Sequence, residues 1–267
     1  MYTNIKSRIK TVFNAAAEKY DRNESGFFSY FGRRAVELAN IPPKSRVLDV
    51  GTGRGTLLFP AINRVGYKGE VFGIDISDRM VRLTAAEITS QGISNARVLR
   101  MDAEHLVFPD NYFDFILCGF AILFFPNPEL AIKEFFRVLK NGGKLVVTTS
   151  GKPDPQWRWF GLLLEKYHRD ETLVNSAVTS ATLKELILKS GFSHINIETE
   201  NKIFTYQDEK EWWNTYMSHG GVRDAIFKME KSLQFKFKQE SIRYVRRMKQ
   251  ESGLHHNRTV LFTIGTK

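Results

Sequence analysis

The segment Val47-Leu48-Asp49-Val50-Gly51-Thr52-Gly53-Arg54-Gly55 joins a short apolar run to three alternate glycines. The run has the length and composition of a buried strand, and a helical pattern follows at 56–66. Glycine has no Cβ, so a glycine-rich turn can bend tightly and lets a ligand approach the main chain closely. This segment therefore predicts the first strand, ligand-binding turn and helix of an α/β sheet.

Strand and helix patterns alternate along the next part of the chain. Short apolar runs occur at 46–50, 70–75, 96–100, 113–119 and 144–150, and helical patterns occur at 77–91 and 128–140. Such alternation is typical of right-handed crossovers in a parallel sheet. Two more strand-like runs follow at 194–205 and 259–266. We expect a doubly wound α/β fold with a seven-stranded, mostly parallel sheet whose last strand is antiparallel.

The chain has 267 residues, enough for one large α/β domain with an added cap. Two helices are expected before Pro42-Pro43, which separate them from the first strand. We predict N-terminal cap helices over 1–40, a ligand-binding core over 41–150, and substrate cap insertions with the closing strands over 151–267. Within these, the α-helical cap is expected to combine 1–40, 151–180 and 206–252.

The spacing of the glycines argues against a dinucleotide site. The dinucleotide pattern G-x-G-x-x-G would need its third glycine at position 56, which is Thr56. Asp49 also places an acid at the end of the strand, where a bound pyrophosphate would be repelled. An uncharged or cationic ligand fits this turn better.

Two more acids follow predicted strands. Asp75 ends the second strand and Asp102 lies just past the third. The carboxyl ends of parallel strands meet at one edge of a sheet, so these side chains should approach the glycine turn. Asp75 could accept hydrogen bonds from both hydroxyls of a ribose, or it could simply be an acid at a helix start. Asp102 could accept a hydrogen bond from an adenine amino group.

These blocks together resemble the motifs of class I S-adenosylmethionine-dependent methyltransferases. The resemblance is specific to the menaquinone/ubiquinone-biosynthesis-like family of small-molecule methyltransferases. Phe13-Asn14-x3-Glu18-Lys19-Tyr20-Asp21 resembles the leading helix of that family, and Arg137-Val138-Leu139-Lys140-Asn141-Gly142-Gly143 resembles its block before the fifth strand. The match covers residues 12–150, and the remainder matches only in layout.

The resemblance implies a Rossmann-like methyltransferase fold and S-adenosyl-L-methionine as cofactor. The sulfonium and ammonium of that cofactor suit the acid at Asp49. The family's roles place Asp49, Gly51 and Gly53 near the methionyl part, Asp75 and Ile76 at the ribose, Asp102 and Ala103 at the adenine, and Cys118 at the tip of the fourth strand. Tyr20, on a helix that folds over the cofactor in that family, is assigned either to the methionyl carboxylate or to the acceptor. A plain core tyrosine is the structural alternative.

Methyl transfer from a sulfonium is an in-line displacement, so positioning in a dry pocket can supply most of the rate. No metal site is predicted, because the sequence has no His-x-x-x-His or Cys/His cluster. If a base removes a proton from the acceptor, His168, His219 and Tyr20 are the candidates, with structural roles as the alternative. Six cap aromatics could line an acceptor pocket or pack in a core: Trp157, Trp159, Phe160, Trp212, Trp213 and Tyr216.

We expect methylation of O, C or N of a small aromatic or apolar molecule. One alternative is an RNA methyltransferase that uses the basic segment 223–250, which has nine Lys or Arg residues and three acids in a chain of net charge +10. The aromatics of that segment follow a helical core period, and Gly119-Phe120-Ala121-Ile122 replaces the Asn/Asp-Pro-Pro-aromatic motif of amino-group methylation in nucleic acids. Both features argue against nucleic acid. The other alternative is a non-catalytic, cofactor-binding partner subunit.

The sequence also indicates a compartment. Cys118 is the one cysteine, which excludes an internal disulfide and favours a reducing environment. No apolar run reaches the length of a membrane span. We expect a cytoplasmic protein without a membrane span, and a homodimer is one open assembly state.

Overall fold

The computed structural model describes residues 2–21, 26–167, 178–218 and 220–267. Its strands are β1 (Arg46–Val50), β2 (Glu70–Asp75), β3 (Ala96–Arg100), β4 (Phe113–Gly119), β5 (Leu139–Ser150), β6 (Ser193–Tyr206) and β7 (Leu254–Thr266). Its α-helices are α1 (Tyr2–Ala16), α2 (Phe27–Ala39), α3 (Leu58–Val65), α4 (Asp78–Ser90), α5 (Pro128–Val138), α6 (Arg158–Tyr167), α7 (Ser180–Lys189), α8 (Glu209–Ser218), α9 (Gly220–Lys228) and α10 (Lys231–Met248). No helix in the described part of the chain is both long and apolar enough to cross a membrane.

The seven strands form one sheet in the order β3-β2-β1-β4-β5-β7-β6. Strands β1 to β5 pair in parallel, whereas β7 runs antiparallel to both of its neighbours, β5 and β6. From β1 the chain adds β2 and β3 on one side of the sheet and then β4 and β5 on the other. This reversal beside β1 is the switch point of a doubly wound sheet. The predicted fold class is confirmed, including the antiparallel last strand.

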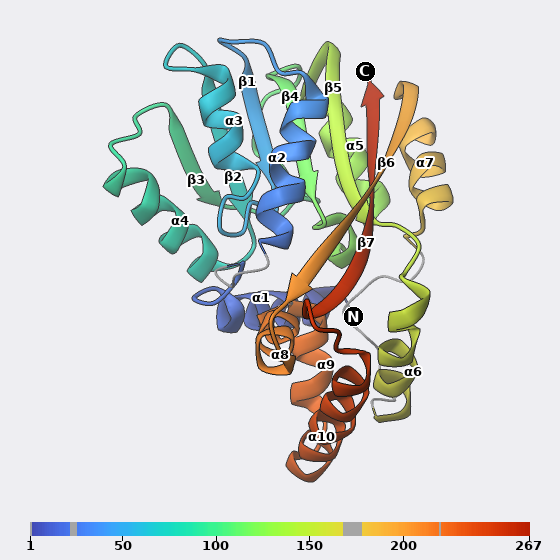
Figure 1. Cartoon of the computed structure of the whole chain (residues 1–267). Coiled ribbons are helices and arrows are strands. Elements are labelled where there is room, and N and C mark those ends of the chain that lie inside the picture. Colours follow the sequence, from blue (N-terminus) through green and yellow to red (C-terminus); the bar gives the residue numbers. More distant parts are fainter. Residues whose placement is uncertain (1, 22–25, 168–177, 219) are drawn as a thin grey trace.

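Helices cover both faces of the sheet (Figure 1). One core cluster joins α2 and α3 to one face, and a second joins α5 and α7 to the other. Local capping agrees with the sequence: Ser77 Oγ accepts a hydrogen bond from the Met80 amide, and Asn127 Oδ1 accepts one from the Leu130 amide. Strand β1 is buried along most of its length, as expected for a central parallel strand.

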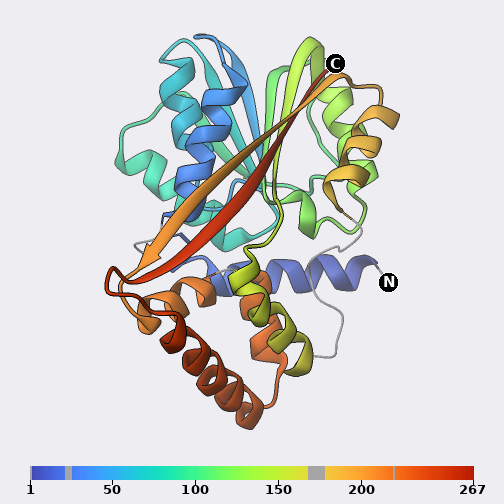
Figure 2. The same ribbon diagram turned by 45° about the vertical axis from the view of Figure 1, so that its right-hand side comes forward.

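Helix α1 lies across the carboxyl edge of the sheet, between the sheet and cap helices α6, α8, α9 and α10 (Figures 1 and 2). Helix α2 also falls within the predicted cap region 1–40, but it packs against α3 and the sheet. Helix α1 ends at Ala16, so Tyr20 lies in the turn after the helix and not at its last residue.

The hairpin of β6 and β7 is longer than its pattern predicts. Pairing with β5 stops at Ser150↔Val260, whereas pairing between β6 and β7 continues to Tyr206↔Leu254. The free half of this hairpin extends past the sheet edge toward the cap (Figure 2). It carries Tyr206 and His256 into the cap, where the Tyr216 hydroxyl and His256 Nδ1 lie 3.0 Å apart.

The cap has its own aromatic core. Trp212 is fully buried, and its ring packs 5.7 Å from that of Trp157 and 4.9 Å from that of Tyr216. None of the six cap aromatics considered from sequence lines the cavity at the glycine loop. Core packing is therefore their role in this structure, and the pocket alternative is wrong for that cavity.

The buried position of Trp212 predicts a stability effect without a binding effect. Trp212→Ala should lower the free energy of unfolding by about 3–5 kcal/mol, because a large aromatic side chain is lost from a packed core. Urea unfolding measures this loss, and calorimetry should show unchanged cofactor affinity in the folded variant. Tyr67→Ala is the control, since Tyr67 is 85% exposed and its loss should cost no more than about 0.5 kcal/mol. Equal losses for the two variants would contradict the assignment.

Candidate active site

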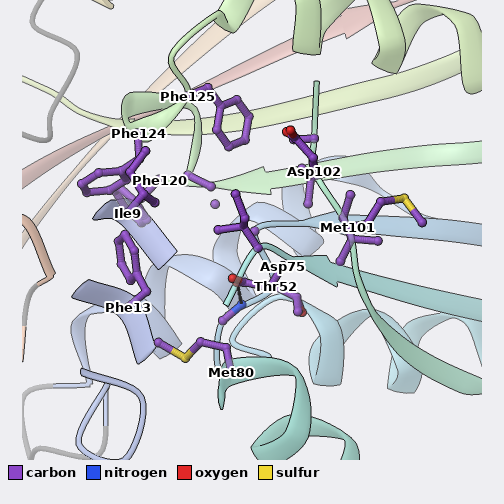
Figure 3. A pocket seen from close by; sticks show the side chains of 18 of the residues that line it. Ile9, Phe13, Thr52, Asp75, Met80, Met101, Asp102, Phe120, Phe124 and Phe125 are labelled. Carbon is purple, nitrogen blue, oxygen red and sulfur yellow. Dashed lines mark hydrogen bonds between the residues drawn. The ribbon is translucent and has the colours of Figure 1, made fainter. Parts of the chain in front are cut away.

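A cavity of about 850 Å³ of empty space, part of it open to solvent, lies between the carboxyl ends of the strands and α1. Its walls come from the glycine loop, the ends of β2 and β3, the segment after β4, and α1. Figure 3 shows Asp75, Met101 and Asp102 toward one side, and Ile9, Phe13, Phe120 and Phe124 gathered on the other. The cavity thus has an acidic, backbone-rich part and an aromatic part.

Two glycines of the loop have distinct roles. Gly51 has φ +67°, and a Cβ there would lie 2.3 Å from the Cβ of Ala121 after β4. Gly53 has φ +52°, and its added Cβ would meet nothing closer than 3.9 Å because it would stand in the cavity. Gly51 therefore lets the loop pack against the segment after β4, and Gly53 leaves room for a ligand.

Asp75 holds the loop in place. Its Oδ2 accepts a hydrogen bond of 2.9 Å from the Gly53 amide, and its Oδ1 accepts one of 2.8 Å from the Ser77 amide. Burial raises the pKa of Asp75 to about 6, although these backbone donors favour its charged form. The same carboxylate lines the cavity, so it joins the loop geometry to any ligand bound there.

Asp49 lies behind the loop and does not line the cavity. Its Oδ2 accepts a hydrogen bond of 2.7 Å from Thr52 Oγ1, while its buried Oδ1 has no hydrogen-bond partner among the described residues. Burial, together with the charge of Asp75, raises the pKa of Asp49 to about 7, against the effect of the Thr52 hydrogen bond. A buried acceptor without a donor favours a cationic or hydrogen-bonding group nearby.

Asp102 is bound to α1. Its Oδ2 accepts a hydrogen bond of 2.7 Å from Lys6 Nζ, and its Oδ1 accepts one of 3.0 Å from the Glu104 amide. Lys6 also pairs with Glu104 at 2.5 Å. Lys6 therefore closes α1 over this end of the cavity, and an adenine amino group would have to share Asp102 with it.

The aromatic part of the cavity is built from segments far apart in sequence. The ring of Phe13 on α1 lies 5.0 Å from that of Phe124, and the rings of Tyr20 and Phe28 stack at 5.0 Å. Phe28 in turn lies 5.4 Å from Phe120. We refer to Phe13, Tyr20, Phe28, Phe120 and Phe124 as the aromatic wall. These rings present an apolar surface with one hydroxyl, that of Tyr20.

Most of the cofactor residues predicted from sequence meet in this cavity. Its lining includes Tyr20, Gly51, Gly53, Asp75, Ile76, Asp102 and Ala103. Cys118 is buried outside the lining like Asp49, and burial raises the pKa of its thiol to about 12. His168 and His219 lie outside the described residues, so their predicted catalytic role stays a prediction.

Sequence reasoning missed the contributions of Lys6, Ile9 and Phe124 to the site. Ile9 has a helical apolar spacing in the sequence, but that spacing does not show what the helix covers. Lys6 and Phe124 had no local signal. No cluster of three His, Cys, Asp or Glu side chains that could hold a metal occurs within the described ranges.

Comparison with known families agrees with this geometry. A sequence model described as the methyltransferase domain matches residues 41–217, which is more than half of the chain. The chain belongs to this family. The matched region contains the glycine loop and all three acids at the strand ends, whereas α1 precedes it.

Curated relatives of this methyltransferase share the same region. Aklanonic acid methyltransferase DauC from Streptomyces sp. (strain C5) is 35% identical over 147 residues, covering 55% of this chain and 67% of that protein. Nocamycin O-methyltransferase from Saccharothrix syringae is 36% identical over 148 residues, covering 55% and 53%. The ubiquinone/menaquinone biosynthesis C-methyltransferase UbiE from Azotobacter vinelandii is 35% identical over 151 residues, covering 55% and 60%. The matches thus span between about half and two thirds of these relatives.

Solved structures share the fold over a larger part of the chain. The YcgJ protein from Bacillus subtilis aligns with a TM-score of 0.64 and 20% identity, covering 89% of this chain and 98% of that one. A SAM-dependent methyltransferase from Aquifex aeolicus aligns with a TM-score of 0.53 and 23% identity, covering 72% and 89%. These similarities establish the architecture.

The glycine geometry gives a matched pair of variants. Gly53→Ala and Gly92→Ala should each lose about 1–2 kcal/mol of stability, since both positions have positive φ and neither added Cβ clashes. Only Gly53→Ala places a methyl group in the cavity, so only it should weaken S-adenosylhomocysteine binding, by about tenfold or more. Thermal unfolding and calorimetry measure the two effects. Equal affinities for the two variants would contradict the role assigned to Gly53, which is to leave room for the ligand.

The raised pKa values of the buried acids predict that the stability of the chain depends on pH. The pKa values of Asp49 and Asp75 are raised in the folded chain, so the unfolded chain loses these protons at lower pH. Their contribution should make the free energy of unfolding of the unliganded chain fall as pH rises from about 4 to 7. Asp49→Asn should reduce this fall, whereas Asp110→Asn, at a side chain 68% exposed, should not. Denaturant unfolding at several pH values tests this, and an unchanged slope in Asp49→Asn would refute it.

Proposed function

We propose that the chain transfers a methyl group from S-adenosylmethionine to O, C or N of a small aromatic or otherwise apolar molecule. One observation carries this proposal: a single cavity joins a glycine cradle with acidic strand ends to the aromatic wall. The family membership supports methyl transfer, and the cavity supports the kind of acceptor.

The acidic part of the cavity suits the cofactor. Asp75 offers a buried carboxylate for ribose hydroxyls, and Gly53 leaves room against the main chain. The resemblance assigns Asp102 and Ala103 to the adenine, and both line the cavity. Asp49 supplies negative charge behind the loop that suits a cationic amino acid part. When bound, the cofactor supplies an activated methyl group. The residues of the chain orient it and keep its surroundings dry.

The aromatic wall suits an apolar acceptor. Exposure of aromatic surface to water is unfavourable, so a flat apolar molecule gains by lying against Phe13, Phe28 and Phe120. No Asp or Glu belongs to this wall. Positioning of the acceptor beside the cofactor in a water-poor space then accounts for most of the rate.

Tyr20 lies where the two parts of the cavity meet. Its ring stacks on Phe28, and its Cε1 lies 3.9 Å from the Cβ position of Gly53. Burial and the nearby Asp21 and Asp75 raise the pKa of Tyr20 well above its usual value. Its hydroxyl therefore stays protonated at neutral pH, which makes Tyr20 a hydrogen-bond donor and a poor base. If a base is used, His168 and His219 remain the candidates.

The names of the relatives support a small acceptor. Aklanonic acid, nocamycin and the quinones are small molecules, and the methyltransferases named for them or for their biosynthesis are 35–36% identical over the shared region. For the RNA alternative, none of residues 223–250 lines the cavity. The non-catalytic alternative leaves the aromatic wall without a role.

Calorimetry tests the cofactor assignment. S-adenosylhomocysteine should bind with a micromolar Kd, about −8 kcal/mol, whereas NAD should give no heat. Asp75→Ala should weaken that binding by about 1–3 kcal/mol, since a charged acceptor is lost. Asp110→Ala is the control, because Asp110 is 68% exposed and does not line the cavity. Heat with NAD alone would overturn the assignment.

The state of Tyr20 predicts a modest kinetic effect. Once an acceptor is found, Tyr20→Phe should lower kcat by about 2- to 13-fold, the loss of one neutral hydrogen bond, and leave the pH profile unchanged. A drop of about 10²–10⁴ with a changed pH profile would instead identify Tyr20 as a base. Tyr67→Phe removes a tyrosine hydroxyl at an exposed position and should leave kcat unchanged, so it serves as the control.

A further inference from the structure

The outer face of α10 is strongly basic. Lys236, Arg243 and Arg247 recur at helical spacing and are exposed, while Phe237, Ser241 and Val245 form the buried face. Within the described residues, no carboxylate lies in ion-pair distance of Lys236, Arg243 or Arg247. We refer to these three residues as the basic face.

The one acid within α10 forms its hydrogen bonds with side chains of α6, although the charge of Arg243 also lowers its pKa. Glu240 turns toward α6, where it accepts hydrogen bonds of 3.1 Å from Lys166 and 2.8 Å from the Tyr167 hydroxyl. Arg246, next to the basic face, pairs with Glu209 at 2.7 Å. The cations of the basic face are therefore concentrated toward solvent.

Two large aromatic side chains lie exposed beside these cations. Phe227 at the end of α9 is 56% exposed, and Phe235 in the second turn of α10 is 65% exposed. Gln234 fixes the connection between the helices, since its Nε2 donates to the Met229 carbonyl at 2.8 Å. This connection lies at the end of the cap farthest from the sheet (Figures 1 and 2).

Exposed aromatic rings near cations that have no carboxylate partner among the described residues match one kind of partner. Aromatic side chains favour the boundary between headgroups and acyl chains, and Lys and Arg favour anionic headgroups. A second copy of the chain would bring like charges together. A single-stranded nucleic acid would require rings spaced along a groove, whereas these two rings lie at one helix connection.

We propose that this end of the cap docks the chain on an anionic lipid surface. Phe227 and Phe235 enter the headgroup region, and the basic face contacts the lipid phosphates. Bilayer docking is additional to methyl transfer and does not depend on the identity of the cofactor.

The docking surface is connected to the aromatic wall through α9. Asp224 on α9 forms an ion pair with Arg8 on α1, and a Cβ at Gly220 would lie 2.7 Å from the ring of Phe13. Only α1 thus separates α9 from the cavity. An apolar acceptor dissolved in the bilayer would be held close to the site that accepts it.

Vesicle co-sedimentation of the full chain tests the proposal. The chain should bind vesicles of phosphatidylcholine with 30% phosphatidylglycerol and not vesicles of phosphatidylcholine alone, and higher salt should weaken binding. Each basic residue near such a surface raises partitioning about fivefold, so Lys236→Glu with Arg243→Glu and Arg247→Glu should lower it by about a hundredfold or more. Phe227→Ser with Phe235→Ser should lower it by about tenfold or more.

Matched controls separate docking from net charge and from folding. Lys68→Glu with Arg97→Glu and Lys184→Glu makes the same charge change at exposed sites elsewhere, and Tyr67→Ser with Val107→Ser removes large side chains that are even more exposed. These control variants should bind vesicles like the unchanged chain. All variants should keep their Tm and their affinity for S-adenosylhomocysteine. Vesicle binding therefore tests docking, and S-adenosylhomocysteine binding tests the cofactor assignment independently of it.

Four outcomes would overturn the proposal. The first is binding without preference for phosphatidylglycerol, and the second is equal loss in the control variants. The third is unchanged vesicle binding in the phenylalanine variant. The fourth is tighter binding to a single-stranded RNA of about 30 nucleotides than to the vesicles, with the same charge reversals abolishing it.

Discussion

The hydrogen bond from the Gly53 amide to Asp75 is the contact on which the site depends. It ties the turn after β1 to the end of β2 with a donor–acceptor distance of 2.9 Å. Asp49 supports the same loop from behind through Thr52. Burial raises the proton affinity of both carboxylates, and the charge of Asp75 raises that of Asp49 further. This arrangement therefore costs stability while it prepares a site for a cation.

Helix α1 covers the cavity that the strand ends form. Lys6 binds the acids after β3, and Asn14 accepts hydrogen bonds from Ser77 Oγ and the Arg79 amide at the start of α4. These polar contacts fix the helix so that Phe13 faces the cavity. The cap then packs against the other side of α1. One short helix therefore relates the sheet, the cavity and the cap to one another.

The acidic part of the site could be predicted because its signals are local. Each acid follows its own apolar strand, and parallel strands bring their carboxyl ends to one edge whatever the loops do. The aromatic wall could not be predicted, since Phe13, Phe28 and Phe120 come from three segments that meet only after α1 docks. The cap tryptophans were ambiguous for a related reason: helical spacing shows that a face is buried but not whether protein or ligand buries it.

The sequence by itself determined the seven strands, their direction, the glycine turn and the identity of the acids, because period, glycine spacing and capping act over a few residues. Tertiary structure alone decided that β6 and β7 extend past β5, that Asp49 and Cys118 lie behind the lining, and that Lys6 covers Asp102. Each of these depends on contacts between residues distant in the chain. Their energies are set by burial and charge pairing in the folded molecule, which no local pattern contains.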